Sequence, residues 1–267
     1  MTLALTLKVT PPQRLDLSPL LPHLLADKSN KDIAAIDLAT TREKITVGDL
    51  FRIRAGSAEE IRFEGGSERF DCVGQGLKQG RIFVAGDAGI NAGRKMTGGE
   101  LVISGDVGPY AGSAMAGGRL EILGDAGDFL TAPREGELHG MSGGLLVVRG
   151  SAGLRAGDRL RRGTILIEGD AGDWLGSRLI AGTLIVLGRA GMSPGYLMRR
   201  GTIVLAKPPA LAATFVDCGH FASSFPAVFG RFLLPESRGA ARLFRTPLRR
   251  FAGDMAVLGK GEIFVPV

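Results

Sequence analysis

The chain repeats itself every 19 residues, and this period constrains the fold more than any single residue does. Six segments share a short apolar run followed by a corner of the Gly-Asp-Ala-Gly type, and a seventh, partial copy follows them. The copies begin at Arg81, Glu100, Arg119, Leu145, Thr164, Thr183 and Thr202, with spacings of 19, 19, 26, 19, 19 and 19 residues. A fixed period of this length is typical of an array of stacked structural units.

Each copy holds one strand and has no room for a helix as well. In the first copy, Ile82 and Val84 alternate with Phe83 and Ala85, which is the period-2 pattern of a strand. The rest of each copy is rich in Gly, Ala and Ser, which disfavours a helix, and the leucine-rich-repeat pattern is absent. The sequence therefore predicts an all-β fold, a parallel β-helix (solenoid) of about seven coils stacked about 4.8 Å apart.

Stacking places equivalent residues of the copies in columns. The first glycine of each corner is expected to have a positive φ or to lie against a neighbouring backbone. This column contains Gly86, Gly105, Gly124, Gly150, Gly169 and Gly188, and the next one contains Asp87, Asp106, Asp125, Ser151, Asp170 and Arg189. The acidic column is either a calcium ladder or a set of turn residues that accept backbone N–H groups. The spacing differs from that of calcium-binding nonapeptides, so the second interpretation is favoured.

A third column is rich in aromatic residues. Its members are Asn91, Tyr110, Phe129, Arg155, Trp174 and Ser193. Rings and an arginine stacked in this way form either a platform for a sugar or a cofactor, or ordinary packing with cation–π contacts. Packing is the favoured interpretation.

The segments outside the repeats are expected to cover the solenoid ends, where strand edges would otherwise be unpaired. We predict an N-terminal cap over residues 1–44, the β-helix repeat domain over 45–206 and a C-terminal capping and partner-binding segment over 207–267. In the cap, Ser18 and Pro19 are expected to begin a short helix. The C-terminal segment holds eight of the thirteen phenylalanines, which indicates a cap, a partner surface or both.

Two features depart from the period. The spacing of 26 marks an insertion of seven residues at Thr131–Glu137, and such a loop is a common place for contact or function. Paired arginines, Arg161-Arg162 and Arg199-Arg200, occupy the same corner two coils apart, about 10 Å from each other. Guanidinium groups match carboxylates and phosphates. The pairs are either a binding patch for an anionic substrate, or a solvated corner or set of interface salt bridges, and the second alternative is favoured.

Composition argues against several classes of protein. Two distant cysteines, Cys72 and Cys218, do not indicate a disulfide framework, an iron–sulfur ligand set or a zinc site built from four cysteines. No apolar run is long enough to span a membrane and no leader peptide is recognisable, so a cytoplasmic location and no membrane partner are expected. The net charge of +6 favours anionic partners, but the interleaved aromatic and basic residues of RNA-binding surfaces are missing, so no nucleic acid is expected.

The chain is poor in catalytic groups. Its three histidines, His23, His139 and His220, lie far apart, and no HxH or HExxH motif occurs. The nearest approach to a metal or nucleophile pair is Cys218 with His220, for which a structural role is favoured. We therefore predict no catalytic and no metal-binding residues, and a scaffold role inside a larger enzyme.

The repeats and the carboxyl end together resemble a known family. Glycine corners at a 19-residue spacing are similar to the glycine-repeat domain of the glutamate synthase large subunit and, more closely, to the C subunit of the formylmethanofuran dehydrogenase family. The run FAGDMAVLGKGEI at residues 251–263 resembles the ending of that protein, and Asp217-Cys218-Gly219 also fits. The resemblance covers residues 45–267.

This resemblance implies a non-catalytic structural subunit whose complex carries its active sites on other chains. The favoured version is the bacterial formyltransferase/hydrolase complex, which moves formyl from formyl-tetrahydromethanopterin to a methanofuran-type carrier and releases formate during formaldehyde oxidation in methylotrophy. Its implied partners are amidohydrolase-like, formyltransferase and dehydrogenase-B-like subunits. The arginine-rich, lysine-poor composition favours this bacterial version over a tungsten or molybdenum formylmethanofuran dehydrogenase. The complex would use the carrier and tetrahydromethanopterin, and no cofactor is assigned firmly to this chain.

The resemblance also suggests a role for the arginines. Carriers of the methanofuran type bear a glutamate-rich tail, which an arginine-rich face would anchor. The candidate residues are Arg155, Arg161, Arg162, Arg178, Arg199 and Arg200. The alternative is that they bind acidic faces of neighbouring subunits.

Two further classes are less well supported. A stand-alone β-helix enzyme acting on polysaccharide predicts a secretion signal and a carboxylate cluster, and neither is recognisable. A spacer related to glutamate synthase predicts flanking amidotransferase and flavin-binding sequence, which this chain lacks.

Overall fold

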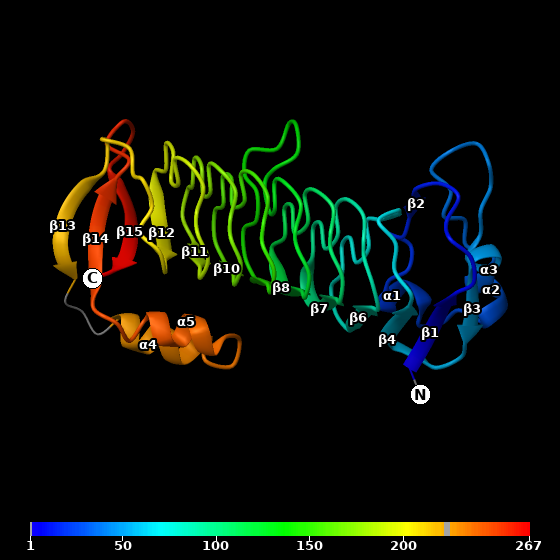
Figure 1. The fold of residues 1–267 in the computed structure, drawn as a ribbon. Helices are drawn as coiled ribbons and strands as arrows, with labels where there is room; N and C mark the ends of the chain where they lie inside the picture. Colours follow the sequence, from blue (N-terminus) through cyan, green and yellow to red (C-terminus); the bar gives the residue numbers. More distant parts are fainter. Residues whose placement is uncertain (1, 222–224) are drawn as a thin grey trace.

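The computed structural model describes residues 2–221 and 225–267 and is built around one large sheet. Thirteen strands follow each other in the order β13-β14-β15-β12-β11-β10-β9-β8-β7-β6-β4-β1-β3, and β2 and β5 form a small separate sheet. Figure 1 shows an elongated molecule with the N-terminal segment at one end and the C-terminal segment at the other. The described helices are short, and the architecture agrees with the predicted all-β class.

The sequence repeats form adjacent parallel strands. These are β6 (Arg81–Val84), β7 (Thr97–Ile103), β8 (Gly117–Ile122), β9 (Leu145–Val148), β10 (Thr164–Ile167), β11 (Thr183–Val186) and β12 (Arg200–Leu205). Residues 19 positions apart pair with each other, as Ile82 does with Leu101, and the offset becomes 26 where Leu120 pairs with Leu146. Between strands the chain runs once around the molecule, giving the stacked turns of backbone, here called coils, in Figure 1.

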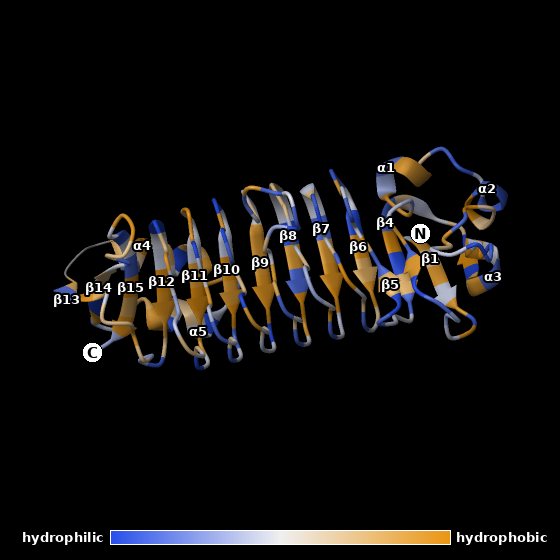
Figure 2. Ribbon diagram, turned by 90° about the horizontal axis from the view of Figure 1, so that it is seen from above, coloured by the Kyte–Doolittle hydropathy of each residue, from blue (hydrophilic) through white to orange (hydrophobic). Residues whose placement is uncertain are grey.

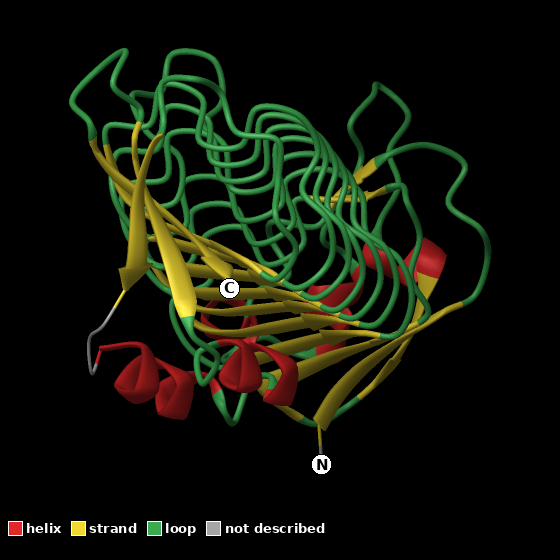
Figure 3. Ribbon diagram, turned by 60° about the vertical axis from the view of Figure 1, so that its left-hand side comes forward, coloured by secondary structure: helices red, strands yellow, loops and turns green. Residues whose placement is uncertain are grey.

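The core lies inside these coils. Alternate residues of each strand, such as Ile82, Leu101 and Leu120, point inward and are fully buried. After each corner, a ladder of single bridges runs along the coils from Ala88 through Val107 to Ala190. Strands therefore form one wall and turns form the remainder, as Figure 3 shows. Figure 2 shows the hydrophobic residues concentrated along the strands.

The corner glycines are needed because neighbouring coils pack closely. Among the six corner glycines, Gly86 alone has a positive φ, of 136°. A Cβ atom on Gly105 or Gly124 would overlap the backbone of the coil before it. The left-handed conformation occurs instead in the aromatic-rich column, where φ lies between 53° and 64° for Asn91, Tyr110, Phe129, Arg155, Trp174 and Ser193. The column of corner glycines therefore agrees with the expectation of close backbone packing, and only Gly86 also has a positive φ.

The acidic column caps turns across coils. A carboxylate oxygen of Asp87 accepts the N–H of Asp106 at 2.9 Å, and Asp106 accepts the N–H of Asp125 at 2.7 Å. The turn-capping interpretation is confirmed, with the donor supplied by the next coil. Within residues 2–221 and 225–267, no group of three or more His, Cys, Asp or Glu side chains is placed to hold a metal ion.

The N-terminal segment, residues 2–71, packs on the first coils. It contains β1 (Thr2–Leu7), β2 (Leu15–Asp16), α1 (Pro22–Leu25), α2 (Asn30–Ala34), α3 (Val47–Leu50), β3 (Phe51–Arg54), β4 (Ser57–Glu64) and β5 (Phe70–Asp71). The expected helix start at Ser18 and Pro19 is wrong, because α1 begins at Pro22 with Leu21 as its N-cap. Ser18 instead donates its N–H to the Asp16 carboxylate, in a turn that precedes the helix.

The C-terminal segment covers both the end of the sheet and part of its outer face. It contains β13 (Val216–Phe221), α4 (Phe225–Leu233), α5 (Arg238–Leu243), β14 (Leu248–Gly253) and β15 (Lys260–Pro266). Strand β15 extends the sheet by pairing in parallel with β12. Helices α4 and α5 lie on the outside of the strand wall (Figures 1 and 3), where they bury outward residues such as Leu166 and Ile185. None of the helices in the described part of the chain has the length and apolar character needed to cross a bilayer.

A ladder of ion pairs runs along this face from one strand to the next. Glu100 bridges Arg81 at 2.6 Å and Arg119 at 3.0 Å, and Glu121 bridges Arg119 at 2.8 Å and Arg149 at 2.5 Å. Burial raises the pKa of Glu121, but hydrogen bonds from Arg119 and Arg149 outweigh burial and hold the pKa below its ordinary value of 4.5. The folded chain therefore binds protons at Glu121 less readily than the unfolded chain does.

This difference predicts a loss of stability in acid. A carboxyl whose folded pKa is lowered stabilises the fold above its ordinary pKa, and this contribution disappears as the pH falls through the folded pKa. We expect the Tm to fall between about pH 5 and about pH 3, and to fall less steeply in Glu121→Gln. Glu59→Gln, at an exposed carboxylate, serves as the control. An equal fall in wild type and Glu121→Gln would contradict the assignment.

Candidate functional site

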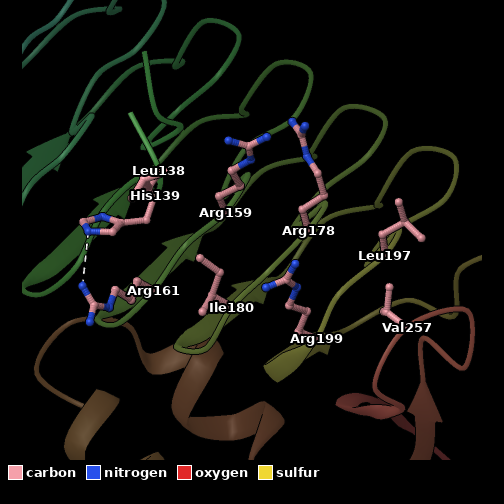
Figure 4. Close-up of a pocket in the computed structure, with 9 residues that line it drawn as sticks. All are labelled: Leu138, His139, Arg159, Arg161, Arg178, Ile180, Leu197, Arg199 and Val257. Carbon is pink, nitrogen blue, oxygen red and sulfur yellow. Dashed lines mark hydrogen bonds between the residues drawn. The ribbon is translucent and has the colours of Figure 1, made fainter. Parts of the chain in front are cut away.

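A basic groove crosses the later coils. Its first part is a cavity of about 490 Å³, and its second part is a cavity of about 320 Å³ that shares Arg161, Ile180 and Arg199 with the first. The first part is lined by Leu138, His139, Arg159, Arg161, Arg178, Ile180, Leu197, Arg199 and Val257, and the second adds Arg162, Ala181, Arg200 and Leu258. These residues are called the arginine groove below, and Figure 4 shows its first part.

The 19-residue register places the groove side chains. Arg159, Arg178 and Leu197 form one column, in which all three have φ between 50° and 54°. Arg161 and Arg199 belong to a second column with Ile180 between them. Backbone hydrogen bonds between coils hold this column, with Ile180 donating to Leu160 at 2.9 Å and Arg199 donating to Leu179 at 2.7 Å. The guanidinium groups are thus carried by a rigid backbone rather than by a long loop.

Two segments from outside the repeat close the groove at its sides. Leu138 and His139 follow the insertion, and Val257 and Leu258 belong to the GDMAVLGKGE ending. The His139 ring nitrogen Nε2 lies 3.3 Å from Nη1 of Arg161, the contact drawn as a dashed line in Figure 4. A neutral His139 accepts this hydrogen bond and orients the arginine.

One groove arginine is held by a buried carboxylate. Arg178 donates to both oxygens of Asp158, at 2.9 Å and 2.6 Å. Asp158 is only 3% exposed, and the Ser177 hydroxyl donates to it at 2.6 Å. This bidentate pair positions Arg178 and uses part of its hydrogen-bonding capacity.

The other groove arginines keep their charge available. Within the described residues, none of Arg159, Arg161, Arg162, Arg199 and Arg200 forms an ion pair. In the part of the chain that the structure describes, no acidic side chain lines the groove. Uncompensated guanidinium groups on adjacent coils favour an extended anion, because each can form paired hydrogen bonds with a carboxylate or phosphate.

The structure brings together five of the six arginines that the sequence indicated. Arg155 does not line the groove, because it belongs to the aromatic-rich column and lies over the Trp174 ring, 5.2 Å from its centroid. Sequence reasoning missed Arg159, although its 19-residue offset from Arg178 was a usable signal. It also missed Val257, whose position depends on the C-terminal strands and has no periodic signal.

The aromatic-rich column packs against itself and against the insertion. Tyr110 and Phe129 stack with centroids 5.0 Å apart and planes 7° apart. Arg134 of the insertion lies over Tyr110 at 4.4 Å, and the pair of Arg94 with Glu137, at 2.6 Å, anchors the insertion. These contacts support the packing interpretation.

Comparison with known proteins relates this fold and groove to a particular assembly. No protein-family model matches the chain. A segment of 78 residues is 41% identical to the C subunit of the formyltransferase/hydrolase complex Fhc of Methylorubrum extorquens, and this alignment spans 29% of each chain. The structure also superimposes on a chain of the formyltransferase/hydrolase complex FhcABCD from Methylorubrum extorquens, solved in complex with methylofuran. The TM-score is 0.95 and the identity 41%, over 99% of both chains.

This sequence identity over nearly the whole length of both chains shows more than a shared fold. It places the chain among the repeat-built subunits of formyl-transferring complexes. The chain belongs to the family of the C subunit of the formyltransferase/hydrolase complex.

Proposed function

We propose that this chain is a non-catalytic structural subunit of a formyltransferase/hydrolase complex. The complex would move formyl from formyl-tetrahydromethanopterin to a methanofuran-type carrier and release formate. The observation that carries this proposal is the full-length similarity, at 41% identity, to a chain of the FhcABCD complex. The partners would be the amidohydrolase-like, formyltransferase and dehydrogenase-B-like subunits, which would hold the active sites.

The scaffold role is supported by what the repeats are made of. The recurring residues are glycines packed against backbone, buried alanines and aspartates bonded to backbone N–H groups. Residues of these kinds build coils and leave few groups for chemistry.

The arginine groove would bind the acidic tail of the carrier. The solved relative contains methylofuran, and the resemblance to its family implies a glutamate-rich tail on such carriers. Apart from Arg178, which pairs with Asp158, the guanidinium groups of this row form no ion pair with the described residues, and such a row complements a row of carboxylates. We place Arg159 in this site with Arg161, Arg162, Arg178, Arg199 and Arg200, whereas Arg155 stands apart in its contact with Trp174.

Reversing charge in the groove tests this proposal. In the assembled complex, Arg161→Glu with Arg199→Glu should raise KM for the carrier about tenfold or more, because two charge-assisted contacts are lost and repulsion is added. The kcat should change little, since the lost binding is the same in the ground state and the transition state. Steady-state kinetics at several salt concentrations provides the measurement.

A matched control separates local from general charge effects. Arg42→Glu with Arg52→Glu makes the same charge change at exposed positions in the N-terminal segment and should leave KM unchanged. An unchanged KM for the groove variant in an intact complex would refute carrier binding. Dissociation of the complex would instead show that these arginines bind a neighbouring subunit.

We infer a parallel β-helix of about seven coils over residues 45–206, capped by residues 1–44 and 207–267. The pairing of equivalent residues from β6 to β12, 19 positions apart except for 26 between β8 and β9, supports the repeated coils. A cytoplasmic location is supported by the two cysteines, Cys72 and Cys218, which are both free thiols.

A further inference from the structure

Helix α4 is apolar on two opposite sides. Pro226, Gly230 and Leu233 are buried, on the side packed on the molecule. Away from that side, Val228 is 63% exposed and Phe232 is 56% exposed, and Leu234, directly after the helix, is 46% exposed. A helix that is hydrophobic all round is normally buried all round. An exposed apolar face of this kind marks an interaction site.

The same pair of helices exposes only positive charge. Arg231, Arg238, Arg242 and Arg245 are exposed, and none of them forms an ion pair with the described residues. The one carboxylate of residues 225–245, Glu236, pairs with Arg119 at 2.9 Å on the strand wall. The surface is therefore apolar with free guanidinium groups. Val228, Phe232, Leu234 and these four arginines are called the outer helical face.

The outer helical face is anchored to the sheet. Besides the pair of Glu236 with Arg119, the Glu236 carbonyl accepts a hydrogen bond from Arg149 at 2.7 Å. Leu233, Ala240 and Leu243 pack against outward residues of β9 to β12. A face held in place before binding loses little conformational entropy when a partner docks.

We propose that the outer helical face docks onto another subunit of the complex, at an apolar surface bordered by carboxylates. This inference rests on the proposed assembly, but it uses no residue of the arginine groove. Charge complementarity selects the partner, because the arginines require acidic groups opposite them. A second copy of this chain is a poor occupant, since a two-fold interface would place arginines against arginines.

Co-purification of the complete complex tests the docking site. With all subunits co-expressed, Val228→Asp with Phe232→Asp should weaken incorporation of this chain at least about thirtyfold, as expected for central apolar contacts of an interface. Native mass spectrometry and titration of the chain into the remaining subunits measure the effect. Arg238→Glu with Arg242→Glu should also weaken binding and make it less sensitive to salt.

Controls separate a docking defect from misfolding. Val9→Asp introduces one such charge at a position that is 53% exposed, in the N-terminal segment, and should assemble normally. The Tm and circular dichroism of each isolated full-length variant should match the wild type, because the altered residues face solvent.

Four outcomes would overturn the inference. Normal assembly of Val228→Asp with Phe232→Asp would do so while leaving the proposed function intact. The inference would also fall if the isolated chain dimerises, or binds phosphatidylserine vesicles, and the variant Val228→Asp with Phe232→Asp loses that property while it still assembles normally. If the unaltered chain fails to join the other subunits, the proposed function and the docking site fall together.

Discussion

Gly118→Ala should destabilise the chain by about 3 kcal/mol, whereas Gly136→Ala should cost only about 1 kcal/mol. Both glycines have nearly the same positive φ, of 83° and 82°. Around Gly136 nothing lies within 4 Å of an added Cβ, but at Gly118 that atom would meet the Gly98 carbonyl oxygen at 2.6 Å. The first variant therefore measures overlap between coils together with backbone strain, and the second measures backbone strain alone.

Urea unfolding of both variants checks this difference, with the free energy of unfolding and its slope compared to the wild type. The slope should stay unchanged if the coils remain stacked. An equal cost at Gly118 and Gly136 would show that glycine is needed for its conformation alone and that neighbouring coils can move apart.

Leu166→Ala should be similarly damaging, at about 3 kcal/mol. Leu166 points outward from β10 but is 0% exposed, because it belongs to the apolar cluster with Leu233, Leu243 and Phe244. Truncation leaves a cavity between sheet and helices. Val102 occupies the same outward position on β7 and is only half-buried, so Val102→Ala should cost about 1 kcal/mol or less.

Thermal unfolding and limited proteolysis together locate the effect of Leu166→Ala. We expect a lower Tm and earlier cleavage in the segment of α4 and α5, because a cavity beneath the helices weakens their attachment most. A Leu166→Ala cost no larger than that of Val102→Ala would mean that the helices contribute little to stability. The outer helical face would then lack the rigid support that its docking role requires.

The strands and their inward-facing residues could be predicted from the period, because each coil forms hydrogen bonds mainly with its neighbours. A 19-residue offset repeated along the chain puts Ile82 beside Leu101 whatever the distant segments do. The same local logic placed Arg161 and Arg199 in one column, separated by Ile180. The same offset of 19 residues separates Arg159 from Arg178.

Positions that depend on the cap segments had no such signal. The runs LLVV, TILI and TLIV of β9 to β11 are apolar on both faces, yet the period does not say what covers the outer face. Val257 reaches the arginine groove because β15 pairs with β12, a contact across about sixty residues that no repeat encodes.

The sequence by itself therefore determined the repeat, the parallel strands and most of the arginine column, because nearest-neighbour hydrogen bonding between coils turns a period into a register. Only the tertiary structure decided how the groove is closed, why Arg155 lies outside it and which outer surface remains apolar. Those features depend on side chains from the insertion and the C-terminal segment meeting the coils, and such contacts form by packing between segments that have no common period.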